Sequence, residues 1–357
     1  TISGATWDSK SANITRKVPS AYSTIQAGLN AASTGDTVLV ASGTYTENII
    51  WPDVNGIKLI GMGDSSTTII KPLSSTNPIM SFKDANGSGI SVIDSTTEVL
   101  NFTLEGIDSE GLGVSIEFQS PKFYKVHITK NKTGLSVNNS SFKLVDSKVS
   151  NNYDRGASIN LSKGNHSVIN ESVFFNNGTT QTSEGGGLLA KSDYGGNNDH
   201  PTVEIKNTKF LFNEAHSGGG IAVIYRLLLI LDNVALKSNK ANQYGGAIFM
   251  DRPRFVDLDG VPIYWDDVKN SDGINTSYIP AWDKVEMSYN EAEIGGGLYL
   301  NYARHYEFGT LMKNLFVVGN KGGGIFSEDS YLAIDSLFER FKKKLFGNLS
   351  FDECVFR

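Results

Sequence analysis

The sequence predicts an all-β chain that folds as one long parallel β-solenoid. The first observation is a motif that recurs from residue 128 onward: an apolar residue, an Asn three positions later, a glycine step and a short apolar segment. The second is the spacing of these Asn residues, as from Asn131 to Asn152 and on to Asn177. Three short strands and three bends occupy about that many residues, which is one coil of a solenoid.

The repeated Asn residues are expected to stack at one corner of the solenoid. In a stack of coils each side chain lies over its counterpart, so amide groups can hydrogen-bond along the stack as a ladder. The glycines after each Asn would permit positive φ at a sharp bend. Asn and Gly could instead be ligands or flexible loop residues, but the shared register favours the structural interpretation. The seven positions are Asn131, Asn152, Asn177, Asn213, Asn239, Asn290 and Asn320.

Each repeat also extends upstream of its ladder position. A polar residue stands six positions before the Asn, as Asn207 does before Asn213, and alternating apolar residues such as Val203 and Ile205 precede it. Alternation over this length is typical of a half-buried strand. The pattern therefore predicts strand, polar corner, strand, Asn corner, glycine bend and strand.

Composition fits one domain over residues 1–357. The chain has 37 Gly, nine Pro and 39% hydrophobic residues, and a solenoid can grow without enlarging the radius of its core. Lys and Arg number 32 against 38 Asp and Glu, a net charge of −6, so we expect no nucleic-acid partner. No apolar run reaches about 18 residues, so we expect no membrane insertion.

The cellular compartment is inferred from composition. Cys354 is the single cysteine, so no internal disulfide can form. A chain rich in Ser, Thr, Asn and Gly and poor in Cys is typical of bacterial surface and secreted β-proteins, so we expect an extracellular or cell-surface location. The first residue is Thr1, which suggests a removed leader. The repeat places its next ladder Asn two residues past Arg357, so we expect a domain of a longer protein.

A short helix is expected at the N-terminus, within a cap that spans residues 1–36. In Ser23–Ser33, Ser23 can cap the helix, Ile25 and Leu29 share a face, and Gly35 lies past the end. Such a helix would cover the apolar end of the first coil. Strands are expected at 37–40, 56–60 and 67–70.

Two resemblances follow from these segments. The opening, with Tyr22–Ala27, Gly35–Val40, Gly43–Glu47 and Ile57–Gly61, resembles the pectate-lyase-like right-handed parallel β-helix superfamily. The later repeats resemble those of polymorphic outer-membrane proteins, whose signatures are GGAI, as at Gly245–Ile248, and FxxN. The resemblance implies a right-handed parallel β-helix, but many activities share that fold.

Insertions follow the glycine strand and are expected to project from one side as the working face. The ranges are 191–201, 251–284 and 301–310. Sugar rings stack on Trp and Tyr, so the aromatic residues of the last two predict a polysaccharide surface, unless they fold inward to anchor the loops. Trp282 aligns with an inward strand position, which favours an anchor for that residue. The candidate carbohydrate-binding residues are Tyr264, Trp265, Tyr278, Trp282, Tyr302 and Tyr306.

A catalytic alternative rests on charged residues of the same insertion. Calcium-dependent lyases need clustered carboxylates for the cation and an Arg or Lys base. The candidates are Asp251, Arg252, Arg254, Asp257 and Asp259. Lys191, Asp193 and His200 form a weaker second group. A charged loop is more often simply solvated, so we expect no catalytic residues and no cofactor, with Ca²⁺ as the exception if a lyase centre exists.

The last insertion, residues 329–347, is expected to be helical. Leu332, Leu337, Phe338, Phe341 and Leu345 follow helical spacing, and Lys342–Lys344 would face solvent.

Three functional hypotheses result. The leading one is an extracellular, non-catalytic polysaccharide-binding or adhesin domain, for a plant cell-wall polymer such as cellulose. The second is a lyase or hydrolase of an acidic polysaccharide, and the third is a surface module that binds proteins.

Overall fold

The fold was analysed in a computed structural model. It describes residues 13–83, 93–107, 110–192, 201–225, 227–252, 282–301, 310–328, 332–335 and 349–351. For 310–313, 327–328, 332–335 and 349–351 it describes the backbone alone.

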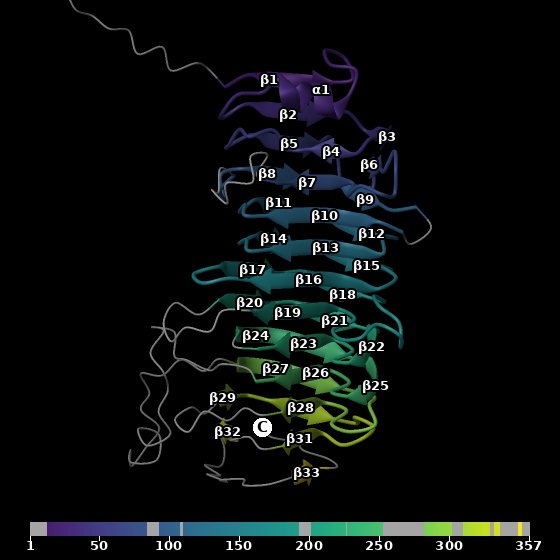
Figure 1. Ribbon diagram of the computed structural model, residues 1–357, viewed down its shortest axis with the longest axis vertical. Coiled ribbons are helices and arrows are strands. Elements are labelled where there is room, and N and C mark those ends of the chain that lie inside the picture. The colour runs from purple at the N-terminus through teal and green to yellow at the C-terminus, as the bar shows by residue number, and fades with distance from the viewer. Residues whose placement is uncertain are drawn as a thin grey trace, which may run out of the picture.

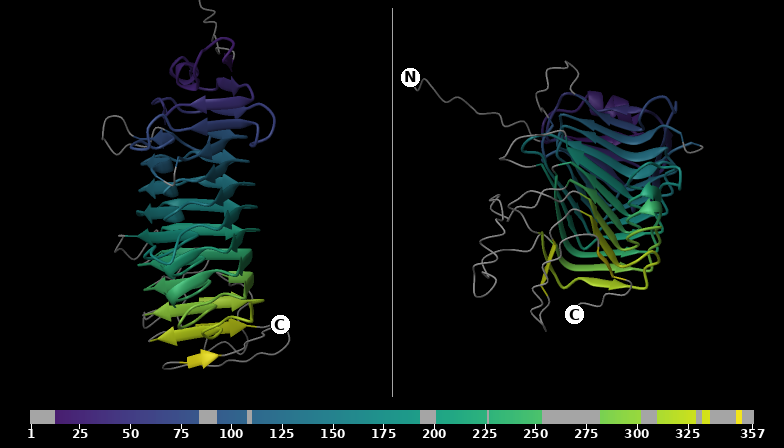
Figure 2. Two further views of the ribbon diagram at one scale, coloured as in Figure 1. Left: turned by 90° about the vertical axis from the view of Figure 1, so that its right-hand side faces the viewer. Right: turned by 60° about the horizontal axis from the view of Figure 1, so that its bottom comes forward.

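The chain winds into a right-handed parallel β-helix (Figure 1; Figure 2). Each coil contributes a first and a second strand to a 20-stranded sheet, called sheet A here, and a third strand to an 11-stranded sheet, called sheet B. Successive coils pair in parallel, as β13 (Thr133–Asn138) does with β16 (Arg155–Leu161). The fold class expected from the repeat and from the resemblance to pectate-lyase-like proteins is therefore confirmed.

The strands of sheet A fall into two series. The first strands are β1 (Thr15–Val18), β2 (Thr37–Val40), β5 (Lys58–Gly61), β8 (Glu98–Leu100), β11 (Lys122–Tyr124), β14 (Lys143–Val145), β17 (His166–Asn170), β20 (Thr202–Lys206), β29 (Thr310–Lys313) and β32 (Leu332–Asp335). The second strands are β3 (Gly43–Thr46), β6 (Thr68–Lys71), β9 (Thr103–Glu105), β12 (His127–Thr129), β15 (Lys148–Ser150), β18 (Val173–Phe175), β21 (Lys209–Leu211) and β30 (Phe316–Val318). Two long strands serve as both, β24 (Leu228–Lys237) and β27 (Trp282–Ser288).

Sheet B contains the third strands. In addition to β13 and β16 they are β4 (Ile49–Ile50), β7 (Met80–Phe82), β10 (Leu112–Glu117), β19 (Leu188–Ser192), β23 (Ile221–Ile224), β26 (Ile248–Asp251), β28 (Leu298–Asn301) and β31 (Ile325–Glu328). The last member, β33 (Leu349–Phe351), pairs antiparallel to β31. A separate two-stranded sheet joins β22 (Glu214–Ser217) to β25 (Lys240–Tyr244).

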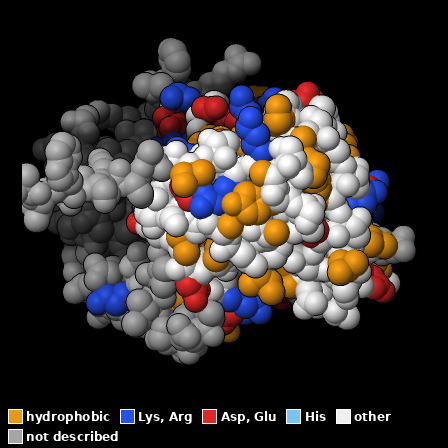
Figure 3. Space-filling view, turned by 90° about the horizontal axis from the view of Figure 1, so that it is seen from above, with side chains coloured by type: hydrophobic (Ala, Val, Ile, Leu, Met, Phe, Trp, Pro, Cys, Tyr) orange, Lys and Arg blue, Asp and Glu red, His pale blue; other side chains and the backbone are white. Residues whose placement is uncertain are grey.

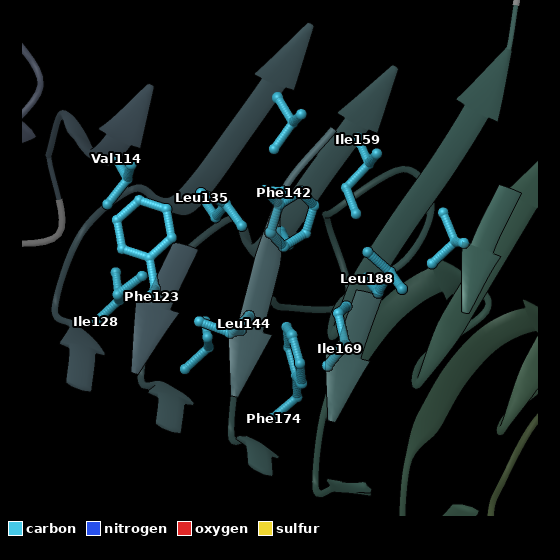
Figure 4. Packing of buried hydrophobic residues seen from close by; sticks show 14 of the residues in the cluster. Val114, Phe123, Ile128, Leu135, Phe142, Leu144, Ile159, Ile169, Phe174 and Leu188 are labelled. Atoms are coloured by element: carbon cyan, nitrogen blue, oxygen red, sulfur yellow. The ribbon is translucent and has the colours of Figure 1, made fainter. Parts of the chain in front are cut away.

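The core runs through the middle of the coils. Inward side chains of sheet A meet those of sheet B, and equivalent residues stack from coil to coil (Figure 4). Phe174 and Phe210, for example, are fully buried and stack with their ring centroids 4.7 Å apart. Stacked rings at this distance add to the burial of apolar surface.

The expected cap helix is present. Helix α1 (Ile25–Asn30) buries Ile25 and Leu29 completely. Its N-cap is Thr24, which accepts a hydrogen bond from the backbone N–H of Ala27, and not Ser23 as expected. In the described part of this end of the molecule, hydrophobic side chains are scattered among polar ones (Figure 3).

The Asn ladder is present at one corner and joins all seven expected residues. From Asn152 onward, each side-chain oxygen accepts one hydrogen bond from the side-chain amide and one from the backbone N–H of the preceding Asn. The side-chain contacts measure between 2.9 and 3.2 Å. The residues are buried, from 0% exposed at Asn213 to 9% at Asn320. The corner is therefore a buried polar network in which neighbouring coils satisfy each other's hydrogen-bonding groups.

A second, shorter ladder lies at the corner between the first and second strands. The backbone N–H of Ser147 donates to Ser172 Oγ at 3.2 Å, and that of Ser172 donates to Thr208 Oγ1 at 3.3 Å. The residue just before each of these has positive φ, as Asn207 does. The polar residue six positions before the ladder Asn is thus the one that makes the tight corner.

The glycines of the third strand have another role than expected. Gly134 and Gly187 do not have positive φ; a Cβ at either would lie 2.5 Å from a carbonyl oxygen of the next coil. Ala247 takes the same position in one coil, so close approach requires a small residue there. Positive φ falls instead on a glycine two positions earlier, such as Gly185 before Gly187.

The helix expected over residues 329–347 is contradicted where the structure describes this range. Leu332–Asp335 forms strand β32, which pairs with β29 in sheet A. Four residues with helical spacing can also form a first strand when the preceding coil has a strand edge to pair with. Here β29 provides that edge. The other residues of the insertion lie outside the described residues.

Candidate functional site

The C-terminal ends of neighbouring strands in sheet B form the edge from which the insertions leave. Strand β19 ends at Ser192, β26 at Asp251 and β28 at Asn301. Ile224 pairs with Asp251, and Asp251 pairs with Asn301, so these strand ends lie next to each other. We call this region, from Lys191 on β19 through Asn301 on β28, the insertion edge.

Asp251 and Asn301 form a polar pair on the outer face of the insertion edge. The Asn301 amide Nδ2 donates to Asp251 Oδ1 at 3.0 Å. Burial raises the pKa of Asp251 above its ordinary value, and the nearby Arg252 charge and the Asn301 hydrogen bond offset this only in part. A carboxyl that is half-buried and partly satisfied can still accept or donate a hydrogen bond to a ligand hydroxyl.

Arg252 and Tyr225 stand beside this pair at the same turn of neighbouring coils. Both have positive φ, and each follows a third strand directly. The Tyr225 N–H donates to the Asp251 carbonyl at 2.9 Å, and the Arg252 N–H donates to the Asn301 carbonyl at 3.0 Å. The Arg252 guanidinium lies over the Tyr225 ring, 5.3 Å from its centroid. Tyr225 is 44% exposed, so the pair offers an aromatic surface and a cation to solvent.

An outward aromatic ladder lies on the same sheet, two positions before the polar pair. Phe249, Tyr299 and Phe326 occupy paired positions of β26, β28 and β31, with ring centroids 5.7 and 5.2 Å apart. Tyr244 packs on Tyr299 at 4.5 Å, and Tyr299 is only 4% exposed. Because the rings stack on one another, their faces are already in contact, whereas a sugar needs a free ring face. The stacked rings therefore hold neighbouring coils together and do not form a binding surface for a sugar.

Of the six aromatic residues predicted to bind carbohydrate, the structure describes only Trp282. Trp282 is the first residue of β27, is 0% exposed and donates its indole N–H to the Leu229 carbonyl at 3.1 Å. Its assignment as a carbohydrate-binding residue is wrong, and the inward strand position that the repeat suggested is its place. The others lie outside the described residues: Tyr264, Trp265, Tyr278, Tyr302 and Tyr306.

The predicted lyase residues are also only partly described. Asp251 and Arg252 are neighbours, with 4.0 Å between Arg252 Nε and Asp251 Oδ1. Lys191 lies on the same outer face, two coils before Asp251. Outside the described residues lie Arg254, Asp257, Asp259, Asp193 and His200.

Metal and nucleophile chemistry find little support in the parts of the chain that the structure describes. No three or more His, Cys, Asp and Glu side chains gather there as a metal site would need. His127 Nε2 lies 2.8 Å from Ser150 Oγ, but Ser150 is 0% exposed, so this pair cannot reach a substrate. No described helix is long and apolar enough to cross a membrane.

Comparison with known proteins gives a likeness of fold. No family model matches the chain, and no curated protein matches it. Among solved structures, ORF18 of Geobacillus virus E2 has a TM-score of 0.51 at 13% identity, covering 88% of this chain and 58% of that one. The chain thus spans just over half the length of the viral protein.

Two further structures are more distant. The PL6 family alginate lyase AlyGC has a TM-score of 0.43 at 13% identity, covering 92% of this chain and 52% of that one. The A-module of the mannuronan C-5 epimerase AlgE4 of Azotobacter vinelandii has a TM-score of 0.43 at 16% identity, covering 85% of this chain and 86% of that one.

Two features of the site escaped the sequence analysis. The outward ladder was missed because Phe249, Tyr299 and Phe326 follow the strand glycine in separate repeats, where only aligning the repeats shows them as one column. Tyr225 was missed because it stands alone in the sequence. The signal that could have identified Tyr225 is its position in the repeat. It lies two residues after Val223, just as Arg252 lies two residues after the equivalent Met250.

Proposed function

We propose that this protein is an extracellular, non-catalytic polysaccharide-binding domain whose ligand contacts the insertion edge. The observation that carries the proposal is the exposed group at this edge, where Arg252 lies over Tyr225 beside the Asp251–Asn301 pair. Sugar hydroxyls both donate and accept hydrogen bonds, so a carboxyl, an amide and a guanidinium side by side suit them. The exposed part of the Tyr225 ring adds apolar contact with a sugar face.

The chemistry at the edge favours binding over cleavage. Hydrolysis of a glycosidic bond in most enzymes requires two carboxyl groups about 5–9.5 Å apart. Among the described residues of the edge, Asp251 is the single carboxyl whose side chain is placed, and it is engaged by Asn301. Binding needs only complementary donors, acceptors and rings, which are present. An extracellular location agrees with the cysteine-poor, Ser-, Thr- and Asn-rich composition.

A lyase is the second candidate, and one observation favours it. Asp251 has a raised pKa and stands next to Arg252. In a lyase that acts on an acidic polysaccharide, a cation neutralises the substrate carboxylate, a base removes the neighbouring proton, and the glycosidic oxygen leaves. The edge supplies the cation, so activity must be measured together with binding.

Retention on insoluble polysaccharides, with cellulose first, tests the proposal. Tyr225→Ala should weaken retention about fivefold, since one aromatic contact contributes about 1 kcal/mol. Tyr289→Ala is the matched control, because Tyr289 also has positive φ and is 68% exposed but directly follows β27 of sheet A, away from the insertion edge. Equal retention of both variants would contradict the proposed surface.

An absorbance assay for unsaturated uronides separates binding from cleavage. A non-catalytic domain releases no product with any polymer that it retains. Product formation that Arg252→Ala abolishes, while retention survives, would establish the lyase instead.

A further inference from the structure

Positive charge is concentrated in one short part of the chain. Residues 118–168 contain eight Lys and Arg against two Asp and Glu, whereas the whole chain has 32 against 38. These residues form the coils that carry β11, β12, β14 and β15 on sheet A. A local excess of cations on an acidic protein indicates a partner of opposite charge more directly than net charge does.

The register places these cations beside one another. Lys122 pairs with Lys143 in neighbouring first strands, and His127 pairs with Lys148 in neighbouring second strands. Both Lys143 and Lys148 are exposed. Like charges at directly paired positions destabilise a sheet. Among the described residues Lys143 and Lys148 form no ion pair, although Lys148 Nζ lies over the Phe175 ring, 5.5 Å from its centroid.

Other lysines on sheet A are neutralised in the next coil. Lys58 Nζ lies 3.0 Å from Glu98 Oε2, and Lys237 Nζ lies 2.8 Å from Glu286 Oε1. In both cases a carboxylate of the next coil lies beside the lysine. Lys143 differs from these lysines, because the residue paired with it in the preceding coil is another lysine, Lys122. The residue paired with Lys148 in that coil is His127, an imidazole and not an acid.

The environment of His127 agrees with an excess of positive charge. Its pKa falls to about 4, first because the ring is buried and then because Lys148 and Lys130 are near, while Glu105 acts in the opposite sense. The histidine is therefore neutral at pH 7 and does not itself repel Lys148.

We define the cationic band as Lys122, Lys143 and Lys148. Its height restricts how wide a partner can be. Glu98 and Glu105 lie in the coil before it, and Glu171 lies in the coil after it. The band is therefore two coils tall, which is about 10 Å at the ordinary strand spacing. A membrane surface or a nucleic-acid duplex is wider and would extend over coils in which lysines are already paired with carboxylates, as Lys58 is with Glu98. A single slender polymer chain fits between them.

We propose that the cationic band binds a linear polysaccharide that carries carboxylate or sulfate groups, as a second contact surface on sheet A. This rests on the proposed function and deepens it by giving the ligand a negative charge. The anionic groups would lie between the ammonium groups and relieve the repulsion that the register imposes. Binding would be salt-dependent, since each neutralised charge releases a counterion.

The test measures dissociation constants of the whole chain for polygalacturonate, dextran sulfate and neutral dextran at 50 and 200 mM NaCl. Lys143→Gln with Lys148→Gln should weaken binding to at least one anionic polymer about tenfold and lower the salt dependence by one to two counterions. The matched control is Lys58→Gln with Lys237→Gln, which removes the same charge from two lysines that are already in ion pairs and should bind as wild type. The two anionic polymers distinguish carboxylate from sulfate recognition.

The outcomes separate this inference from the proposed function. Equal losses in the two double variants, or no binding to either anionic polymer, would overturn the cationic band as a glycan surface. Retention on cellulose would then still support the insertion edge. Tighter binding to duplex DNA than to both anionic polymers would also overturn the band's assignment. The melting temperature of the band variant should not fall, because relief of like-charge repulsion stabilises the sheet; a fall with unchanged binding would assign Lys143 and Lys148 a structural role.

Discussion

Replacement of Asn213 by Ala should show how strongly the ladder holds adjacent coils together. Asn213 Oδ1 accepts hydrogen bonds from the Asn177 N–H at 3.1 Å and from Asn177 Nδ2 at 2.9 Å. Asn213 Nδ2 donates to the Phe174 carbonyl at 3.1 Å and to Asn239 Oδ1 at 2.9 Å. The side chain is 0% exposed, so water cannot replace these partners without a local opening.

The expected cost follows from the groups left without partners. Alanine leaves the Asn177 N–H and one Asn177 amide hydrogen unpaired in the interior, and it removes the side-chain hydrogen bond to the Phe174 carbonyl. Asn239 Oδ1 keeps the backbone N–H of residue 213, at 3.0 Å. One unsatisfied buried group costs about 1–3 kcal/mol, and partial relaxation reduces the sum, so we expect a loss of about 3 kcal/mol in the free energy of unfolding.

Denaturant unfolding and amide hydrogen exchange give the measurement. The N–H of Asn177 should lose protection, while amides several coils away keep theirs, because each coil of a solenoid contacts only its neighbours. Asn131→Ala is the comparison, since among the described residues Asn131 Oδ1 has no hydrogen-bond partner and no preceding Asn depends on it. Its loss should be clearly smaller. Equal losses at Asn131 and Asn213, or a loss within error at Asn213, would refute the ladder as the source of stability.

Three further predictions concern single residues. His127→Gln should remove part of the pH dependence of stability: the folded pKa of about 4 lies below the ordinary histidine value of 6.5, so the contribution of His127 is present above pH 6.5 and is lost as pH falls toward 4, by about 1–2 kcal/mol after allowance for partial exposure. Unfolding of wild type and variant at pH 7 and 4.5 checks this, and parallel pH profiles would contradict it. Trp282→Ala should lower the free energy of unfolding by about 3–5 kcal/mol, measured as a lower midpoint in urea. A variant as stable as wild type would return Trp282 to the candidate binding residues. Gly219→Ala should lower the melting temperature by several degrees, because its Cβ would lie 2.4 Å from the Lys240 carbonyl oxygen, and an unchanged value would show that the coils can separate.

The sequence by itself determined the repeat and therefore the fold. A ladder residue such as Asn213 must sit at one point of the coil, because the same Asn with the same apolar neighbours recurs in register. Stacking turns a one-dimensional period into a direct three-dimensional contact, so the sequence also determined which residues are neighbours. The inward position of Trp282 follows from the same register, since its place in the repeat matches a buried strand position.

Only the tertiary structure decided what each neighbour does. That Gly134 serves close approach and not positive φ depends on the distance to the next coil, which no single repeat contains. The segment at Leu332 follows helical spacing, yet it forms a strand because β29 offers an edge to pair with. The contact between Tyr225 and Arg252, and the juxtaposition of Lys122 with Lys143, arise between neighbouring coils, whose separation in the sequence varies with the insertions. Local pattern fixes the period, whereas the chemistry of the surface depends on what the stacking of coils brings together.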